Sequence, residues 1–207
     1  MSTYLSDDEQ AEALKKWWKE NAVSIIVGAG LGFGIIFGWQ GWQMFQTSQG
    51  EAASQLYAQV EQATKSGADF DNTATQLKAD YAGSAYASYA AMQQAKAAYK
   101  AGNPDRARSE LEWVMANAPD PVLVDLARLR LAALLVDQQQ YDAAKEVIAA
   151  AGTFMKGDFE QLQGDIARAQ GDKVAALAAY QAAASSGVTD MRLLSMKIVD
   201  VTPVEGK

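Results

Sequence analysis

The hydrophobic positions along the chain follow two different patterns. Residues 22–39 (AVSIIVGAGLGFGIIFGW) carry no charge, and Ser24 is the one plainly polar side chain among them. As an α-helix this stretch is about 27 Å long at 1.5 Å per residue, close to the roughly 30 Å of a bilayer core. Because a helix satisfies its own backbone hydrogen bonds within lipid, the stretch predicts one transmembrane helix over residues 22–42.

The residues that flank this span support a membrane anchor. Amphipathic aromatic side chains gather at the two interfaces of a bilayer. Both ends of the span carry tryptophans, namely Trp17, Trp18, Trp39 and Trp42. Lysines precede the span, and no lysine or arginine follows it until Lys65. The positive-inside rule then predicts a cytoplasmic tail at residues 1–21 and a domain on the far side of the membrane at residues 43–207.

A cleaved signal peptide is the alternative interpretation of this segment. Such a peptide has a short basic leader, a shorter apolar core and a cleavage site of small residues directly after it. Here the leader is acidic overall and GWQMFQTSQG follows the core, which favours an uncleaved anchor. Within the tail, Ala11, Leu14, Trp17 and Trp18 share one helical face. That face indicates a short amphipathic helix at the interface or, alternatively, a site for a cytoplasmic partner.

Glycines recur within the span at four-residue intervals, which places them on one side of a helix. They are Gly30, Gly34 and Gly38, with Gly28 and Gly32 on a second ridge. We interpret the first three as a smooth face for packing against another transmembrane helix. The alternative is that glycine is simply frequent in membrane helices. A nucleotide-binding loop is excluded, because the sequence has neither G-x-G-x-x-G nor a following Gly-Lys-Ser/Thr.

Beyond the span the pattern is helical throughout. Apolar residues recur at three- and four-residue steps, alanine is abundant, and long runs of alternating β-branched residues are absent. This pattern predicts an all-α domain, with glycine and proline turn signals between the helices. The predicted helices cover roughly residues 43–66, 71–82, 84–101, 104–117, 121–138, 141–151, 156–170, 173–186 and 189–200.

Three of the helical hairpins share a repeated pattern. Their turns fall at Gly102, Gln139 and Gly171, which are 37 and 32 residues apart. Small residues occupy equivalent positions on both helices, and a larger apolar residue follows four positions later. These positions are Ala95, Ala132 and Gly164, then Ala107, Ala144 and Ala176, and then Leu111, Ile148 and Tyr180. The unit resembles a degenerate form of the 34-residue tetratricopeptide repeat, which implies an α-solenoid of stacked hairpins. Residues 51–82 are expected to form a leading hairpin and residues 189–200 a capping helix.

The first helix of each hairpin is expected to line the concave wall of such a solenoid. In this register the wall comprises Tyr89, Met92, Lys96, Tyr99, Lys100, Leu126, Leu129, Val136, Gln161, Asp165 and Arg168. Tyrosine and methionine side chains suit adaptable binding of extended or unfolded polypeptide. The alternative is that Leu126, Leu129 and Val136 belong to the core.

The composition narrows the chemistry that the chain can perform. Its 207 residues contain 18 Lys+Arg against 25 Asp+Glu, a formal net charge of −7, so it lacks a basic footprint for nucleic acid. It has no histidine and no cysteine, which excludes histidine bases, thiolate chemistry and disulfides. Acids such as Asp120, Asp125, Asp158 and Asp165 are expected to be helix caps or exposed charges. We therefore expect no enzymatic activity, no cofactor and no metal site.

The order of these parts resembles the YfgM family, the ancillary subunits of the bacterial Sec translocon. The resemblance covers essentially the whole chain and is sharpest at residues 16–21 (KWWKEN), 38–42 (GWQGW) and 193–199 (LLSMKIV). It implies a bacterial inner-membrane protein with a cytoplasmic N-terminus and a periplasmic domain. It also implies association with the SecYEG channel and with the membrane-anchored, prolyl-isomerase-like chaperone PpiD. The family has no catalytic motif to carry over to this chain.

The sequence thus predicts a single-pass scaffold and chaperone for unfolded or newly translocated polypeptides. The alternative is a cell-envelope assembly adaptor that makes no contact with clients. Such an adaptor would self-associate through the glycine face of Gly30, Gly34 and Gly38.

Overall fold

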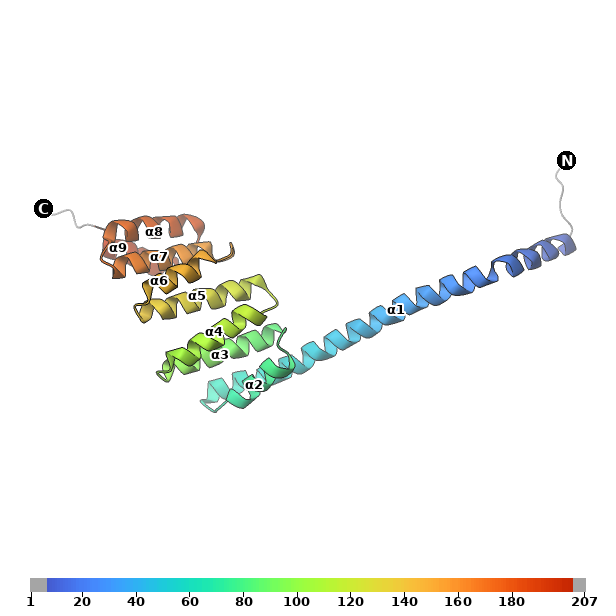
Figure 1. Cartoon of the computed structure of the whole chain (residues 1–207), viewed down its shortest axis with the longest axis horizontal. Coiled ribbons are helices and arrows are strands. Elements are labelled where there is room, and N and C mark those ends of the chain that lie inside the picture. The colour runs from blue at the N-terminus through green and yellow to red at the C-terminus, as the bar shows by residue number, and fades with distance from the viewer. Residues whose placement is uncertain (1–6, 203–207) are drawn as a thin grey trace. The chain divides into compact units, whose positions relative to one another are not determined.

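The structure is a computed structural model that describes the backbone of residues 7–202 and the side chains from residue 10 onward. Within that range the secondary structure is entirely helical, which confirms the all-α class (Figure 1). The helices are α1 (Asp7–Ser66), α2 (Asp71–Asp80), α3 (Ala85–Lys100), α4 (Pro104–Asn117), α5 (Pro121–Asp137), α6 (Tyr141–Ala149), α7 (Lys156–Ala169), α8 (Lys173–Ser186) and α9 (Met191–Val201).

The first helix, α1, is one uninterrupted element of 60 residues. The sequence pattern separates a span at residues 22–42 from a helix that begins at residue 43, but the structure shows no break between them. The physical reason is that residues 40–50 contain no proline, and an isolated glycine weakens a helix without ending it. By length and composition α1 could cross a membrane, and it is the one helix of the described residues for which this holds.

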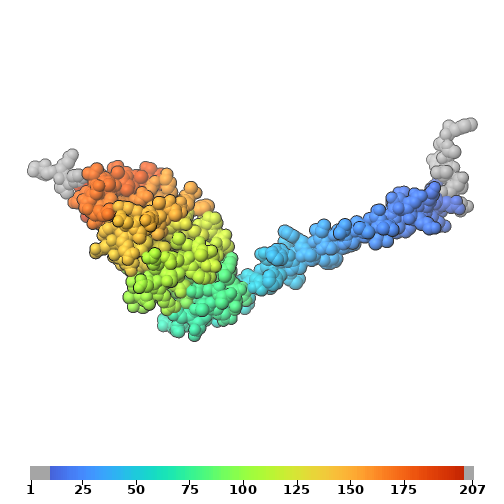
Figure 2. Space-filling model, viewed as in Figure 1, coloured from blue at the N-terminus to red at the C-terminus, as the bar shows by residue number. Residues whose placement is uncertain are grey.

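The chain divides into two compact units, with the boundary between Gly50 and Glu51. In the first unit the large apolar side chains of α1 are exposed, as for Phe33 at 60% and Ile35 at 73%. The second unit holds the end of α1 and all the later helices. There most helices contact their neighbours in sequence, and the unit forms a close-packed body in which the colours follow one another in chain order (Figure 2). This arrangement is the stacking of a solenoid.

The turns between paired helices repeat the same backbone geometry in three hairpins. Gly102, Gln139 and Gly171 all have positive φ, at 75°, 59° and 85°. After each of them the next amide donates to a carbonyl five residues earlier, for example Asn103 N to Ala98 O at 2.9 Å and Gln140 N to Leu135 O at 2.8 Å. This is the hydrogen-bond pattern of a Schellman cap. Gln139 adopts it although it has a side chain, so the repeat register predicted from sequence is confirmed.

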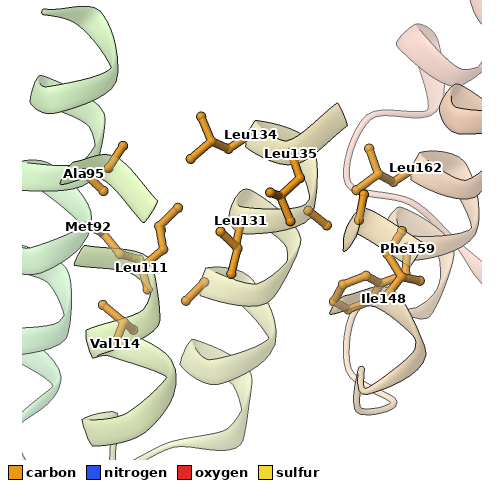
Figure 3. Close-up of a cluster of buried hydrophobic side chains, with 14 of the residues drawn as sticks. Met92, Ala95, Leu111, Val114, Leu131, Leu134, Leu135, Ile148, Phe159 and Leu162 are labelled. Carbon is orange, nitrogen blue, oxygen red and sulfur yellow. The ribbon is translucent and has the colours of Figure 1, made fainter. Parts of the chain in front are cut away.

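One cluster of buried apolar side chains joins consecutive hairpins from α3 to α7. Leu131 and Leu135 on α5 lie between Leu111 of the preceding hairpin and Ile148 and Phe159 of the following elements (Figure 3). Two smaller clusters extend the core, one around Val60 and Leu77 and the other around Tyr180 and Leu194. Because each cluster draws on neighbouring hairpins, burial of the apolar faces depends on stacking.

The last hairpin shows how the small positions of the repeat allow close approach. Gly164 is buried on α7, and an added Cβ there would lie 2.4 Å from ring carbons of Tyr180 on α8. The Tyr180 ring is fully buried, and its hydroxyl donates to Asp165 Oδ1 at 2.8 Å. Burial and this hydrogen bond raise the pKa of Tyr180 far above its ordinary value. Lys197 of α9 donates to the other oxygen of Asp165 at 2.6 Å, which fastens the capping helix to the hairpin.

Asp125 corrects one expectation of the sequence analysis. It is 2% exposed, neither a cap nor a surface charge. Its Oδ1 accepts from Arg128 at 2.6 Å and from the backbone amide of Gly152 at 2.9 Å. A carboxylate can be buried when it is paired and hydrogen-bonded in this way. Asp120, by contrast, caps α5 as expected and accepts from the amide of Val122 at 2.8 Å.

The contact between Gly164 and Tyr180 predicts the effect of a single methyl group. Gly164→Ala is expected to lower the free energy of unfolding by about 1–3 kcal/mol, the usual cost of overpacking. The control is Gly83→Ala, where an added Cβ meets nothing within 4 Å. Denaturant unfolding of the full chain in detergent, followed by circular dichroism, measures both. Equal stability of the two variants would contradict the close approach.

Candidate functional site

The second unit contains a cavity of about 580 Å³ between the end of α1 and helices α3, α4 and α5. We call it the groove. It is lined by Tyr57, Tyr89, Met92, Gln93, Ala95, Lys96, Tyr99, Ala107, Leu111, Leu126, Arg130, Ala133, Leu134 and Asp137. Its size falls within the range of ligand-binding clefts, and most of its lining is aromatic or aliphatic, as is typical of such sites.

The structure brings together five of the eleven wall residues that the sequence singled out. Tyr89, Met92, Lys96, Tyr99 and Leu126 all line the groove. They come from α3 and from the facing helix α5. Their role in binding remains a prediction.

Other expected wall residues lie elsewhere. Leu129 and Val136 are half-buried against the main core cluster, in line with the alternative interpretation that Leu126, Leu129 and Val136 belong to the core. Leu126 packs against the same cluster and also lines the groove. Lys100, Gln161, Asp165 and Arg168 do not line the groove. Arg168 instead donates to Asp200 of α9 at 2.9 Å, and Asp165 accepts from Lys197. The α7 residues therefore hold the capping helix in place.

Sequence reasoning missed Tyr57, Gln93, Arg130 and Asp137. Tyr57 belongs to α1, and its ring lies 5.8 Å from those of both Tyr86 and Tyr89, within the range of aromatic pairs. Burial raises the pKa of its hydroxyl. Arg130 and Asp137 follow Leu126 on one face of α5, Arg130 four residues after Leu126 and Asp137 seven residues after Arg130. Residues at this spacing share one face of a helix, and this is the sequence signal from which Arg130 and Asp137 could have been assigned to the same wall as Leu126.

The polar groups of the groove are unequally engaged. The hydroxyl of Tyr99 donates to Asp137 Oδ2 at 2.8 Å. This hydrogen bond raises the pKa of Tyr99. Neighbouring protein atoms desolvate the guanidinium of Arg130 and lower its pKa from the ordinary value of arginine. The side chain stays charged near neutral pH, because that ordinary value lies so far above it.

The arrangement offers surface for binding and no set of reacting groups. Among the described residues no group of three or more acidic, histidine or cysteine side chains could hold a metal ion. The polar groups that line the groove are tyrosines, one glutamine, two cations and one carboxylate. Side chains of this kind recognise a peptide through stacking, hydrogen bonds and charge.

The candidate membrane residues of the first unit are open to their surroundings. A Cβ atom added at Gly30, Gly34 or Gly38 would meet no other atom within 4 Å. The interface tryptophans are exposed as well, with Trp17 at 51%, Trp18 at 52%, Trp39 at 63% and Trp42 at 57%. Helix packing through the glycines and interfacial seating of the tryptophans remain predictions.

These features define the class of protein, a tetratricopeptide-repeat-like solenoid preceded by a helix apolar enough to cross a membrane. The model of the tetratricopeptide repeat-like domain family matches residues 15–203. No solved structure matches the chain.

Relatives of similar length narrow the family. The chain is 32% identical over 207 residues to the ancillary SecYEG translocon subunit of Haemophilus influenzae, covering 96% of this chain and 98% of that protein. It is 28% identical over 201 residues to the protein of the same name from Escherichia coli, with the same coverage. The Neisseria gonorrhoeae protein of that name is 28% identical over 211 residues. The chain therefore belongs to the tetratricopeptide repeat-like family and, within it, to the ancillary SecYEG translocon subunits, the YfgM family.

The chain has no native cysteine, so single cysteines can be introduced to test the groove. The geometry of the groove predicts which of them a thiol reagent can reach. Ala133 is exposed and lines the groove, whereas its neighbour Ala132 is 0% exposed. In the native full chain, Ala133→Cys should react with a maleimide and Ala132→Cys should react only after denaturation. Mass spectrometry of the labelled protein measures this. Equal labelling of the two native variants would contradict the described geometry of α5.

Proposed function

We propose that this protein is a membrane-anchored ancillary subunit of the Sec translocon that binds newly translocated polypeptides at the far side of the membrane. The observation that carries the proposal is the groove, an open hollow with a largely aromatic and apolar lining on a repeat solenoid. Surfaces of this composition adapt to many extended segments. The protein is a scaffold and chaperone in this proposal, acting by protein–protein binding and without catalysis.

The anchor and the relatives support the placement beside the channel. Relatives that align over nearly their whole length are named as SecYEG translocon subunits. The lysines before the span support a cytoplasmic tail at residues 1–21, a span at 22–42 and a periplasmic domain at 43–207. In this proposal the protein resides in the bacterial inner membrane. The SecYEG channel and the chaperone PpiD are its partners, PpiD through the family resemblance.

Tethering explains why weak contacts in the groove suffice for this task. A site held near the channel exit meets an emerging chain at a high effective concentration. A groove built from tyrosine, methionine and leucine side chains can then bind and release many sequences without strong selectivity. This is the behaviour that assistance to newly translocated proteins requires.

Site-specific cross-linking tests the proposal in the intact protein. A photo-reactive amino acid at Ala133 should form adducts with a secretory chain stalled in the channel, because Ala133 lines the groove. The same group at Ser185, exposed on α8 and outside the groove, is the control. Channel subunits should co-purify with both variants. Equal adduct yields at the two positions would contradict client binding in the groove. Absence of channel subunits from the purified protein would contradict the translocon assignment.

The open glycine face favours a second candidate function, a self-associating adaptor of the cell envelope. Gly34→Leu places a large side chain on that face and should abolish self-association of α1 if the adaptor interpretation holds, because close backbone approach needs small residues. Ile36→Leu, on the opposite side of the helix, is the matched control. Cross-linking in membranes reads out the oligomer. Retained channel association with a monomeric Gly34→Leu chain would favour the translocon subunit over the adaptor.

A further inference from the structure

The charges of the groove are out of balance with those of the rest of the protein. Three charged residues line it, the cations Lys96 and Arg130 and the anion Asp137. The whole chain carries a formal net charge of −7. The groove is thus a locally cationic site in an acidic protein, and such a site attracts groups of the opposite charge.

Within the part of the chain that the structure describes, the two cations of the groove make no ion pair, and neither does Arg192 on α9, whereas the other four arginines are paired. Arg106 bonds Asp71 at 2.7 Å, Arg128 bonds Asp125 at 2.6 Å, and Arg168 bonds Asp200 at 2.9 Å. Within the described part of the chain, Arg130 and Lys96 make no ion pair and no side-chain hydrogen bond. The one carboxylate of the groove, Asp137, already accepts the hydroxyl of Tyr99 at 2.8 Å.

The position of Arg130 makes an unpaired charge useful for recognition. It lies four residues after Leu126 and four before Leu134, so the guanidinium shares its face of α5 with apolar side chains. The residue is exposed, so a ligand can reach the guanidinium, and neighbouring protein atoms desolvate it only in part. A guanidinium in such surroundings gains most from a planar, bidentate partner such as a carboxylate.

We propose that the groove selects polypeptide segments in which an aspartate or glutamate side chain lies close to a large apolar residue. The carboxylate pairs with Arg130, assisted by Lys96, and the apolar side chain enters between the tyrosines and Leu126. This inference rests on the proposed function and names the class of segment that the same groove takes. An internal side chain is the occupant, since a chain that emerges from a channel presents its internal segments before its C-terminus.

Matched peptides bound to the full chain in nanodiscs test the inference. The four peptides have the same length and apolar residues. Three have amidated C-termini and carry aspartate, asparagine or lysine at one internal position, and the fourth carries asparagine and a free C-terminal carboxylate. Fluorescence anisotropy is expected to show the aspartate peptide binding about tenfold more tightly than the asparagine peptide, a difference of about 1.4 kcal/mol. The lysine peptide should bind most weakly.

Variants assign this preference to the groove. Arg130→Gln should reduce the difference between aspartate and asparagine peptides to within about twofold, with the asparagine peptide bound as before, since a rim charge adds selectivity more than apolar affinity. Arg130→Lys should retain part of the preference, and Lys96→Gln should weaken it. Arg192→Gln, on the surface of α9 and outside the groove, is the control. Melting temperatures confirm that each variant is folded.

The outcomes separate the inference from the proposed function. If aspartate and asparagine peptides bind equally to the unaltered protein, the groove binds polypeptide without acid selection and the inference is overturned. If only the peptide with the free C-terminal carboxylate binds more tightly than the amidated asparagine peptide, the proposal that the groove takes an internal acidic side chain is overturned. If none of the peptides binds, the proposed function itself fails.

Discussion

A single helical hairpin cannot bury its own apolar face, and the whole second unit depends on that constraint. Leu111, Leu131 and Leu135 are each below 5% exposed because side chains from the next hairpin cover them. Each hairpin is covered by the next one along the stack in the same way. The last hairpin is covered by α9, whose Leu194 lies in a cluster with Tyr180. Asp165 completes this end through Tyr180 and Lys197, so the last helix is held by apolar burial and by charge together. Loss of one interface exposes the faces on both of its sides.

Close stacking in turn depends on small residues and on tight turns at fixed positions. Ala132 and Ala144 are fully buried where the helices of one hairpin touch, and Gly164 gives the same approach to a tyrosine ring. The three turns reverse the chain direction with the same backbone geometry. Gln139 adopts the positive φ of this turn at a steric cost that glycine does not have. Residues without large side chains thus decide the spacing at which the larger ones interlock.

The sequence predicted those features whose causes are local. Helix ends follow from turn and cap chemistry, so Gly102, Gln139 and Gly171 could be aligned from their neighbouring residues alone. The residues of the groove wall were harder to predict from the sequence. A helix has about 3.6 residues per turn, so the face that it presents to the groove must be known to within one residue. On α5 the sequence suggested Leu126, Leu129 and Val136 as wall residues, whereas the groove uses Leu126 with Arg130, and Leu129 and Val136 pack against the core. Asp125 was expected at the surface because its partner Gly152 lies in a distant loop that no local pattern reveals.

The groove itself follows from the composition of the helices around it. Alanines at positions 95, 107 and 133 leave room between α3, α4 and α5 that larger residues would fill. Tyrosines at positions 57, 89 and 99 surround that room with side chains that have an apolar body and a polar tip, and such side chains can meet a peptide without losing much conformational freedom. Tyr89 and Tyr99 stay exposed at 39% and 47%, so they offer surface that a fully packed core would cover. The same alanine-rich packing therefore holds the repeats together and leaves the groove open between them.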